Sequence, residues 1–429
     1  MALSGRAAAV ALAGALVILA TRTTAALIAI DGLILAAILA DLILAGSPGP
    51  RALAITRKGD TRVRLGEPAT ITTTIVNTGR RTVAAQVRDA WPPSANARPA
   101  RRAIRVKKGA QVTLTLTLTP ERQGDCAADR VTVRSFGPLG LAARQRGHRV
   151  PWTVRALPPF RSRRHLPGKL ALLRELDGQH RSARPGQGSE FDSLREYVIG
   201  DDVRSIDWRS TARRGDVLVR TYRPERDRRI LFVLDTGRTS AGRVGGYPRL
   251  DTAKEAVQLL TAIAARAGDR IDLIAADQRI RARVLAPPRT SALAAVTDAL
   301  ATLEPELTEP DGRLLAATVL AHARRRCLVV LLTDLNPSLP VPPELRVVAA
   351  RHELLVGAVS DPRAQELAAG RGEAAKVYAA AAAARFSAER LALSATLTRL
   401  GATVVDAPPS KLPPALADTY LSLKAAGRL

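Results

Sequence analysis

Carboxylates gather between residues 188 and 214, where their spacing would allow them to act together. Six acidic side chains lie within eighteen positions there, and five of them form the candidate cluster: Glu190, Asp192, Asp201, Asp202 and Asp207. Paired carboxylates can serve as general acid and base, or can hold a metal ion. A hydrolase built on this acidic cluster is therefore one hypothesis for the function.

Arginines interleaved with these carboxylates favour a structural role instead. They are Arg195, Arg204, Arg209 and Arg213. A guanidinium that pairs with a carboxylate lowers the pKa of the acid, which makes it a poor proton donor. The same stretch holds Phe191, Tyr197 and Trp208, although aromatic residues make up only 3% of the chain. Because such rings need burial, we expect a packed element fastened down by ion pairs, with Trp208 buried.

The chain that follows this stretch alternates between strand and helix patterns. Apolar runs predict strands at residues 230–234, 270–275, 327–333, 354–359 and 402–405, with an edge strand at 279–285. Helices are predicted at 249–266, 291–303, 313–325, 364–400 (with a break near 370–372) and 413–426. This order predicts an α/β domain with a mostly parallel sheet and helices on both faces. Sites form at the carboxyl ends of such strands, where Asp235 and Asp334 stand.

The N-terminus reads as a membrane anchor. Residues 7–20 are apolar, and residues 25–45 are apolar except for Asp31 and Asp41. Two apolar runs with a very short link predict a two-helix transmembrane hairpin. Basic residues after the second run then predict, by the positive-inside rule, a multi-pass protein of the cell membrane with the bulk of the chain cytoplasmic.

A signal peptide is the alternative interpretation of the first apolar run, and it would invert this topology. Charges inside the second run are costly in lipid. We expect Asp41 near the interface, whereas Asp31 lies deeper and is either neutral or faces the partner helix.

A small basic β-domain is predicted for residues 51–157. Alternating patterns predict strands within 63–76, 111–119, 131–134 and 150–154, as in a β-sandwich. From Arg51 to His165 there are 24 Lys and Arg against 6 Asp and Glu, which is +18 of the net +26. This excess next to the apolar runs favours contact with an anionic inner leaflet. Nucleic acid is not expected as a partner, because no run of stacking aromatics or recognition motif is visible.

Several classes of site are disfavoured by composition. The five histidines and two cysteines form no zinc-binding pattern, and the two cysteines imply no disulfide framework. The sequence has no GxxxxGK[ST] phosphate loop, so ATP hydrolysis by that route is not expected.

The segment GSEFDSLREYVIGDDVRSIDWRSTARRG, followed by an apolar strand and DTGRTSAG, resembles the domain-of-unknown-function 58 family, and SFGPLGL at residues 135–141 resembles the end of that family's β-domain. The resemblance implies a von Willebrand factor A-like (Rossmann-type) fold. The expected organisation is a membrane hairpin (1–50), a β-domain (51–157), a connector with the core motif (158–229) and the von Willebrand A-like domain (230–429). The core motif consists of Glu190, Phe191, Arg195, Tyr197, Asp201, Asp202, Arg204, Asp207, Trp208 and Arg213.

The resemblance also implies a possible site for Mg2+ or Mn2+, formed by Asp235, Thr239 and Asp334. Such hard cations take oxygen ligands. Gly237 stands where the metal-binding motif has a second serine, so one oxygen is missing.

Two further residues near this site are ambiguous. The threonine that completes such a site is not obvious, because Thr308 is a poor match. Arg238 could pair with Asp235 or Asp334 and substitute for the ion.

Finally, the resemblance implies an association with MoxR-type AAA+ ATPases and no established catalysis. We therefore expect a membrane-anchored, non-catalytic adaptor or scaffold in cell-envelope or stress-related assembly. Two alternatives remain: a divalent-metal-dependent protein-binding module without an ATPase partner, and the hydrolase built on the acidic cluster.

Overall fold

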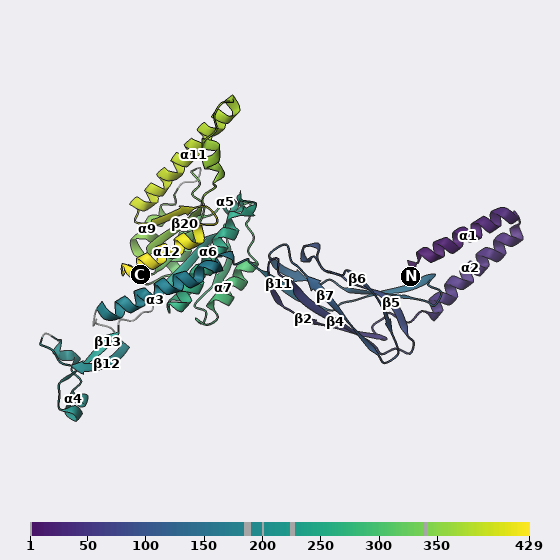
Figure 1. Cartoon of the computed structure of the whole chain (residues 1–429), viewed down its shortest axis with the longest axis horizontal. Helices are drawn as coiled ribbons and strands as arrows, with labels where there is room; N and C mark the ends of the chain where they lie inside the picture. Colours follow the sequence, from purple (N-terminus) through teal and green to yellow (C-terminus); the bar gives the residue numbers. More distant parts are fainter. Residues whose placement is uncertain (1, 184–189, 200, 224–227, 338–340) are drawn as a thin grey trace. The chain divides into compact units, whose positions relative to one another are not determined.

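The computed structural model describes residues 2–183, 190–199, 201–223, 228–337 and 341–429. The chain forms two compact units, Met1–Pro158 and Pro159–Leu429 (Figure 1). Both helices and sheets are present, so the protein is of mixed α/β class.

Two apolar helices, α1 (Gly5–Thr21) and α2 (Thr24–Leu44), begin the first unit and lie side by side (Figure 1). Gly14 allows the close approach, since a Cβ there would lie 2.9 Å from Ile30 of α2. By length and composition α2 could cross a membrane, whereas α1 is apolar but shorter. The sequence left two expectations for Asp31, that it is neutral or that it faces the partner helix. Asp31 is exposed, so it does not face α1.

Asp41, in the last turn of α2, is completely buried against the β-domain. Its carboxylate accepts hydrogen bonds from the backbone N–H groups of Leu139 (2.7 Å), Leu141 (2.7 Å) and Ala142 (2.8 Å). A Cβ on Gly137 would collide with Asp41, so this loop needs glycine at that position. The carboxylate therefore joins the end of α2 to the turn that follows residue 136.

The β-domain is built from three sheets. The first has the order β2 (Leu53–Gly59), β4 (Ala69–Asn77), β7 (Gln111–Leu118). The second has the order β1 (Ala2–Leu3), β10 (Ala142–His148), β9 (Val131–Phe136), β5 (Val83–Asp89), β6 (Arg101–Val106), and the third has the order β3 (Arg62–Arg64), β11 (Thr153–Leu157), β8 (Gly124–Ala127). Alternate residues of β4 are buried, and Ile75 shares one core with Val83 and Val133 of the second sheet. Period-2 sequence thus gives two sheets that enclose an apolar core.

The second unit contains a six-stranded sheet. Its order is β18 (Ile280–Val284), β17 (Arg270–Ala276), β14 (Arg229–Asp235), β19 (Leu328–Leu332), β20 (Glu353–Val359), β21 (Thr403–Ala407). All neighbouring strands are parallel except the edge strand β18, which pairs antiparallel with β17. Each strand lies where an apolar run predicts it, with ends that differ by a residue or two.

Helices cover both faces of this sheet. Ile230, Phe232 and Leu234 of β14 share a core with α3 (Leu166–Ala183), α6 (Arg249–Arg266), α7 (Ala292–Ala301) and α12 (Leu412–Ala425). Leu231 and Val233 point the other way, to a core with α8 (Gly312–His322), α9 (Glu344–Arg351) and α11 (Ala374–Arg399). A strand apolar at every position is thereby buried on both sides.

In the second unit the break predicted near residues 370–372 is present, and one short helix was not predicted. The Ala-rich run 364–400 divides into α10 (Arg363–Ala368) and α11, and Gly372 between them has a φ of +93°. Helix α9 was not predicted, because it is only eight residues long. Short elements complete the second unit: η2 (Arg161–His165), α5 (Arg238–Ala241), β15 (Arg243–Val244) and β16 (Tyr247–Pro248), while η1 (Pro93–Ala95) belongs to the first.

A lysine is buried in α6. The ammonium of Lys254 donates to the carbonyl of Leu303 (2.6 Å), and burial lowers its pKa from 10.5 to about 8. Between these two pH values the unfolded chain holds a proton that the folded chain has released, so the free energy of unfolding should rise from pH 8 to pH 10.5.

Lys254→Met should remove this rise and stabilise the protein at pH 7, where the cost of the buried charge is complete. The check is chemical unfolding of the full-length protein in detergent at a series of pH values. Lys376→Met, at an exposed lysine of α11, is the control. An equal rise in the wild type and Lys254→Met would contradict the prediction.

Candidate functional site

The candidate site lies where strands β14 and β19 end. These neighbours are parallel, with Leu234 opposite Leu332, so the residues that follow them come together at one edge of the sheet. Connections leave this pair in opposite directions, towards β17 on one side and β20 on the other. Ligand sites of open α/β sheets form at such a switch point, outside the carboxyl ends of the strands.

Asp235, the last residue of β14, is only 1% exposed, and both of its carboxylate oxygens are occupied. Oδ1 accepts the backbone N–H of Gly237 (2.7 Å). Oδ2 accepts the hydroxyls of Thr239 (3.2 Å) and Thr333 (2.8 Å). Burial raises the pKa of Asp235 and the nearby charge of Asp334 raises it further, while these hydrogen bonds lower it.

Gly237 explains the missing serine of the metal-binding motif. A Cβ at this position would lie 2.9 Å from the carbonyl oxygen of Thr308 and 3.1 Å from Oδ1 of Asp235. The Thr308 carbonyl also accepts the N–H of Arg238 (2.8 Å). The loop before α8 therefore packs closely on the loop after β14 and leaves no room for a side chain there.

Asp334 is neutralised by two arginines. Its Oδ2 pairs with Arg249 at the start of α6 (3.1 Å), and its Oδ1 pairs with Arg390 of α11 (2.8 Å). The guanidinium of Arg390 also binds both oxygens of Asp406 (2.7 and 2.9 Å) and the carbonyls of Leu335 and Val359. All five of its N–H groups are thus used. Burial lowers the pKa of Arg390, but its pairing with Asp406 and Asp334 outweighs that effect and raises it.

Arg238 does not have the role considered for it. It pairs with Glu309, not with Asp235 or Asp334, and both partners are half exposed. The substitution of an ion by arginine occurs instead at Asp334, through Arg249 and Arg390.

The residues Asp235, Thr239 and Asp334 are brought together, but they do not fit a divalent cation. Guanidinium groups occupy both oxygens of Asp334, and the hydroxyl of Thr239 donates to Asp235. Within the described residues, no group of three or more His, Cys, Asp or Glu side chains could hold a metal ion. Mg2+ and Mn2+ would need several free oxygen ligands at this edge.

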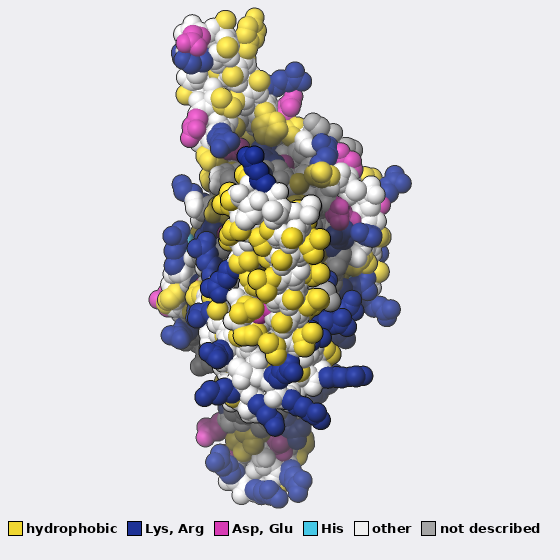
Figure 2. Space-filling model, turned by 90° about the vertical axis from the view of Figure 1, so that its right-hand side faces the viewer, with side chains coloured by type: hydrophobic (Ala, Val, Ile, Leu, Met, Phe, Trp, Pro, Cys, Tyr) yellow, Lys and Arg dark blue, Asp and Glu magenta, His cyan; other side chains and the backbone are white. Residues whose placement is uncertain are grey.

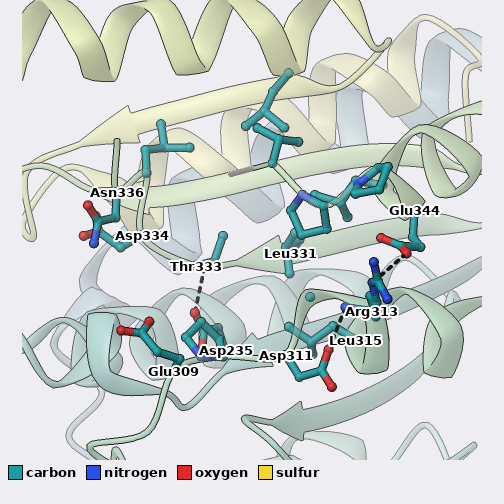
Figure 3. Close-up of a pocket in the computed structure, with 18 of the residues that line it drawn as sticks. Asp235, Glu309, Asp311, Arg313, Leu315, Leu331, Thr333, Asp334, Asn336 and Glu344 are labelled. Atoms are coloured by element: carbon teal, nitrogen blue, oxygen red, sulfur yellow. Dashed lines mark hydrogen bonds and ion pairs between the residues drawn. The ribbon is translucent and has the colours of Figure 1, made fainter. Parts of the chain in front are cut away.

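A pocket of about 730 Å³ opens beside these residues (Figure 3). Its apolar lining includes Leu315, Leu331, Leu345, Leu393 and Leu397. Polar side chains at its edge are mostly paired with each other or with the backbone: Arg313 with Glu344 (3.3 Å), and Asp311 with the first turn of α8. A pocket with this lining binds chiefly by burying apolar surface.

The core motif forms a separate hairpin. Strand β12 (Glu190–Glu196) pairs antiparallel with β13 (Leu218–Arg223), and η3 (Val203–Ser205) and α4 (Trp208–Arg214) connect them. Glu190 and Phe191 are placed by this pairing, while their side chains lie outside the described residues. The side chain of Asp192, another member of the acidic cluster, also lies outside the described residues.

Carboxylates of the motif are engaged locally. Asp201 pairs with Arg195 (2.5 Å), which lowers its pKa. Asp207 caps α4 through the N–H of Ser210 and pairs with Arg220 (2.9 Å), and both contacts lower its pKa. Asp202 accepts the N–H of Arg204. Carboxylates that are paired with arginine, as Asp201 and Asp207 are, make poor general acids.

The expectation that Trp208 is buried is wrong. Trp208 is 65% exposed and Ile199 is 96% exposed, while Tyr197 is half buried and Arg204 and Arg213 are exposed. The ion pairs described above run within the hairpin and do not fasten it to the sheet. Among the side chains of this hairpin that the structure describes, only Leu218 and Val219 are buried, and the indole of Trp208 is in contact with solvent.

Residues 193–386 match the family model described as "Protein of unknown function DUF58". This segment, 45% of the chain, matches the DUF58 family. The matched segment begins inside the core motif and includes both Asp235 and Asp334. The resemblance seen in the sequence is therefore confirmed.

Similar proteins include the uncharacterized proteins Rv1480 of Mycobacterium tuberculosis and Mb1516 of Mycobacterium bovis, each 30% identical over 194 residues, or 45% of this chain. The chain spans 61% of the length of these curated relatives.

Solved structures with some likeness include the CARDB domain of PF1109 from Pyrococcus furiosus (14% identity, 27% of this chain and 91% of that one, TM-score 0.19). Another is a GH20 exo-β-N-acetylglucosaminidase from Vibrio harveyi (12% identity, 83% of this chain and 75% of that one, TM-score 0.20). Such low TM-scores carry no argument about this chain.

Sequence reasoning missed several residues of the site. Thr333 is the last residue of a predicted strand and stands beside Asp334, so its position could have been noticed. Asp277 likewise follows a strand, β17, and accepts the hydroxyl of Thr236 (3.0 Å). Arg249 and Arg390 lie in helices, and no local pattern marks them as partners of Asp334.

Proposed function

We propose that this protein is a membrane-anchored, non-catalytic adaptor that holds a protein partner at the carboxyl ends of its strands. The observation that carries the proposal is the apolar pocket at the switch point, whose buried carboxylates are already paired. Asp235 is held by hydroxyls and an N–H, and Asp334 by two guanidiniums. Groups held in this way support a fixed binding surface better than they support proton transfer.

The finer description of the fold is von Willebrand A-like. Its support is the order of the central sheet, which in chain order is 3-2-1-4-5-6, with one antiparallel edge strand and helices on both faces. The partner surface of such a domain would be the edge at Asp235 and Asp334.

The anchor is a two-helix transmembrane hairpin in this proposal. The apolar length of α2, its packing against α1, and the basic residues that follow support a multi-pass arrangement in the cell membrane with the bulk of the chain cytoplasmic. The partner that the family resemblance favours is a MoxR-type AAA+ ATPase in cell-envelope or stress-related assembly.

Purification of the tagged full-length protein from its native membrane in mild detergent, with and without an ATP analogue, tests this proposal. Leu393→Lys places a charge in the pocket, whereas Leu391→Lys on the same helix is a control at a side chain that is 72% exposed. A stoichiometric AAA+ ATPase that is lost with Leu393→Lys but kept with Leu391→Lys supports the adaptor. Recovery of the protein alone in every nucleotide state rejects it.

Trp208 offers a second test. Because the indole is mostly exposed, Trp208→Ala should change the free energy of unfolding by less than about 1 kcal/mol, measured by chemical denaturation. A loss of 3 kcal/mol or more would mean that the ring is buried in solution. If the variant is stable but loses the ATPase, the contact lies on the β12–β13 hairpin instead of the pocket.

A further inference from the structure

We propose that the end of the first unit that carries α1 and α2 binds the headgroups of anionic phospholipids. The residues that would make this contact are Arg6, Arg80, Arg81, Lys107 and Lys108. This inference rests on the membrane anchoring in the proposed function, and it adds which surface of the β-domain meets the bilayer and which lipids that surface selects.

Both apolar helices are attached to the same end of the β-domain. Before α1, Leu3 pairs with Ala142, and Ser4 bonds to the carbonyls of Gly140 (2.6 Å) and Leu141 (2.9 Å). After α2, Asp41 binds the N–H groups of the same loop. With both ends fixed directly to residues 139–142, a bilayer that contains α2 must have its headgroups at this end of the domain.

Two basic loops lie at this end, because β5 begins there with Val83 and β6 ends there with Val106, its partner in the sheet. Asn77 joins the two loops: its side-chain amide donates to the carbonyls of Arg81 (2.9 Å) and Val106 (3.0 Å). The guanidinium of Arg81 donates to the carbonyl of Ile43 (2.6 Å), in the last turn of α2. The loops and the helix end thus form one continuous surface.

The cations of this surface are available for a ligand. All five side chains are exposed, and none of them makes an ion pair within the residues that the structure describes. Loops 78–82 and 107–110 contain no acidic residue. Figure 2 shows the apolar side chains of the helices with Lys and Arg side chains around them.

Anionic headgroups are the ligand that this arrangement fits. Long Lys and Arg side chains keep their stems on apolar surface and extend their charges to the interface. Each such cation near an anionic leaflet strengthens binding several-fold. The surface lies where apolar helices leave the domain, a geometry that suits a bilayer and offers no groove or stacking ring for nucleic acid.

The test uses the full-length protein in nanodiscs of phosphatidylcholine, with or without phosphatidylglycerol. The variant replaces Arg80, Arg81, Lys107 and Lys108 with glutamine. The control replaces four exposed arginines with glutamine at the other end of strands β5, β6 and β9: Arg88, Arg101, Arg102 and Arg130. The variant and the control therefore have the same net charge. Readouts are hydrogen exchange of loops 78–82 and 107–110 and the lipids retained in native mass spectrometry.

Phosphatidylglycerol should slow exchange in both loops of the wild type and of the control, and the variant should lose about ten-fold or more of the preference for this lipid. Equal exchange in both membranes, or an equal loss in the control, overturns the inference. So does duplex DNA that binds through these four residues while phosphatidylglycerol has no effect. If the protein leaves native membranes on carbonate washing, the anchoring itself fails, which is a different result from an anchored protein without lipid preference.

Discussion

Replacing Asp41 with alanine should destabilise the first unit by at least about 3 kcal/mol. Three backbone N–H groups would lose their acceptor: those of Leu141 and Ala142, whose bonds are buried, and that of Leu139, whose bond is partly buried. Each buried donor left unsatisfied costs about 1–3 kcal/mol. Hydrogen exchange of the peptide that covers residues 137–143, in the full-length protein in nanodiscs, should become much faster, and the thermal midpoint should fall.

Asp31→Ala is the matched control, since Asp31 lies on the same helix but is exposed. This change should leave exchange at residues 137–143 as it is in the wild type. Asp41→Asn keeps one acceptor oxygen and should give an intermediate result. Wild-type exchange and stability in Asp41→Ala would show that the carboxylate does not hold the helix to the domain.

The difference between Asp31 and Asp41 shows what sequence can and cannot provide. Both are charges in one apolar run, and the pattern predicts that such charges are costly in lipid. The partners of Asp41 lie about a hundred positions further along the chain, at Leu139 to Ala142, and only the folded β-domain brings them to α2.

The central sheet could be predicted far better than the hairpin before it. Continuous apolar runs such as residues 230–234 can be satisfied only between two layers of helices, and helix α6 has the bounds that its periodicity predicts. In residues 190–214 the mixture of rings and charges allows two solutions, a docked element or a self-contained hairpin. Local ion pairs such as Arg195–Asp201 satisfy the charges without docking, so the ring of Trp208 stays exposed.

Arg390→Met should destabilise the second unit by about 3–5 kcal/mol, because it leaves Asp406 without its partner and Asp334 with Arg249 alone. The methionine fills much of the space, so the loss reports mainly on charge and hydrogen bonding. Urea unfolding of the full-length protein in detergent, monitored by circular dichroism, measures it. Arg385→Met, at an exposed arginine on the same helix that pairs with Glu389, should show no measurable change.

Two further measurements separate the charge effect from packing. The double variant Arg390→Met, Asp406→Asn should recover part of the lost stability, since Asp406 no longer carries an unpaired charge. Protonation at low pH removes the charge that Arg390→Met leaves without its cation on Asp406. The deficit relative to wild type should therefore shrink as the pH falls towards the carboxyl range. The contrary outcome is a loss of stability that does not depend on pH and is not recovered in the double variant. It would mean that Arg390 acts through packing, and that an internal arginine does not replace a cation at this edge of the sheet.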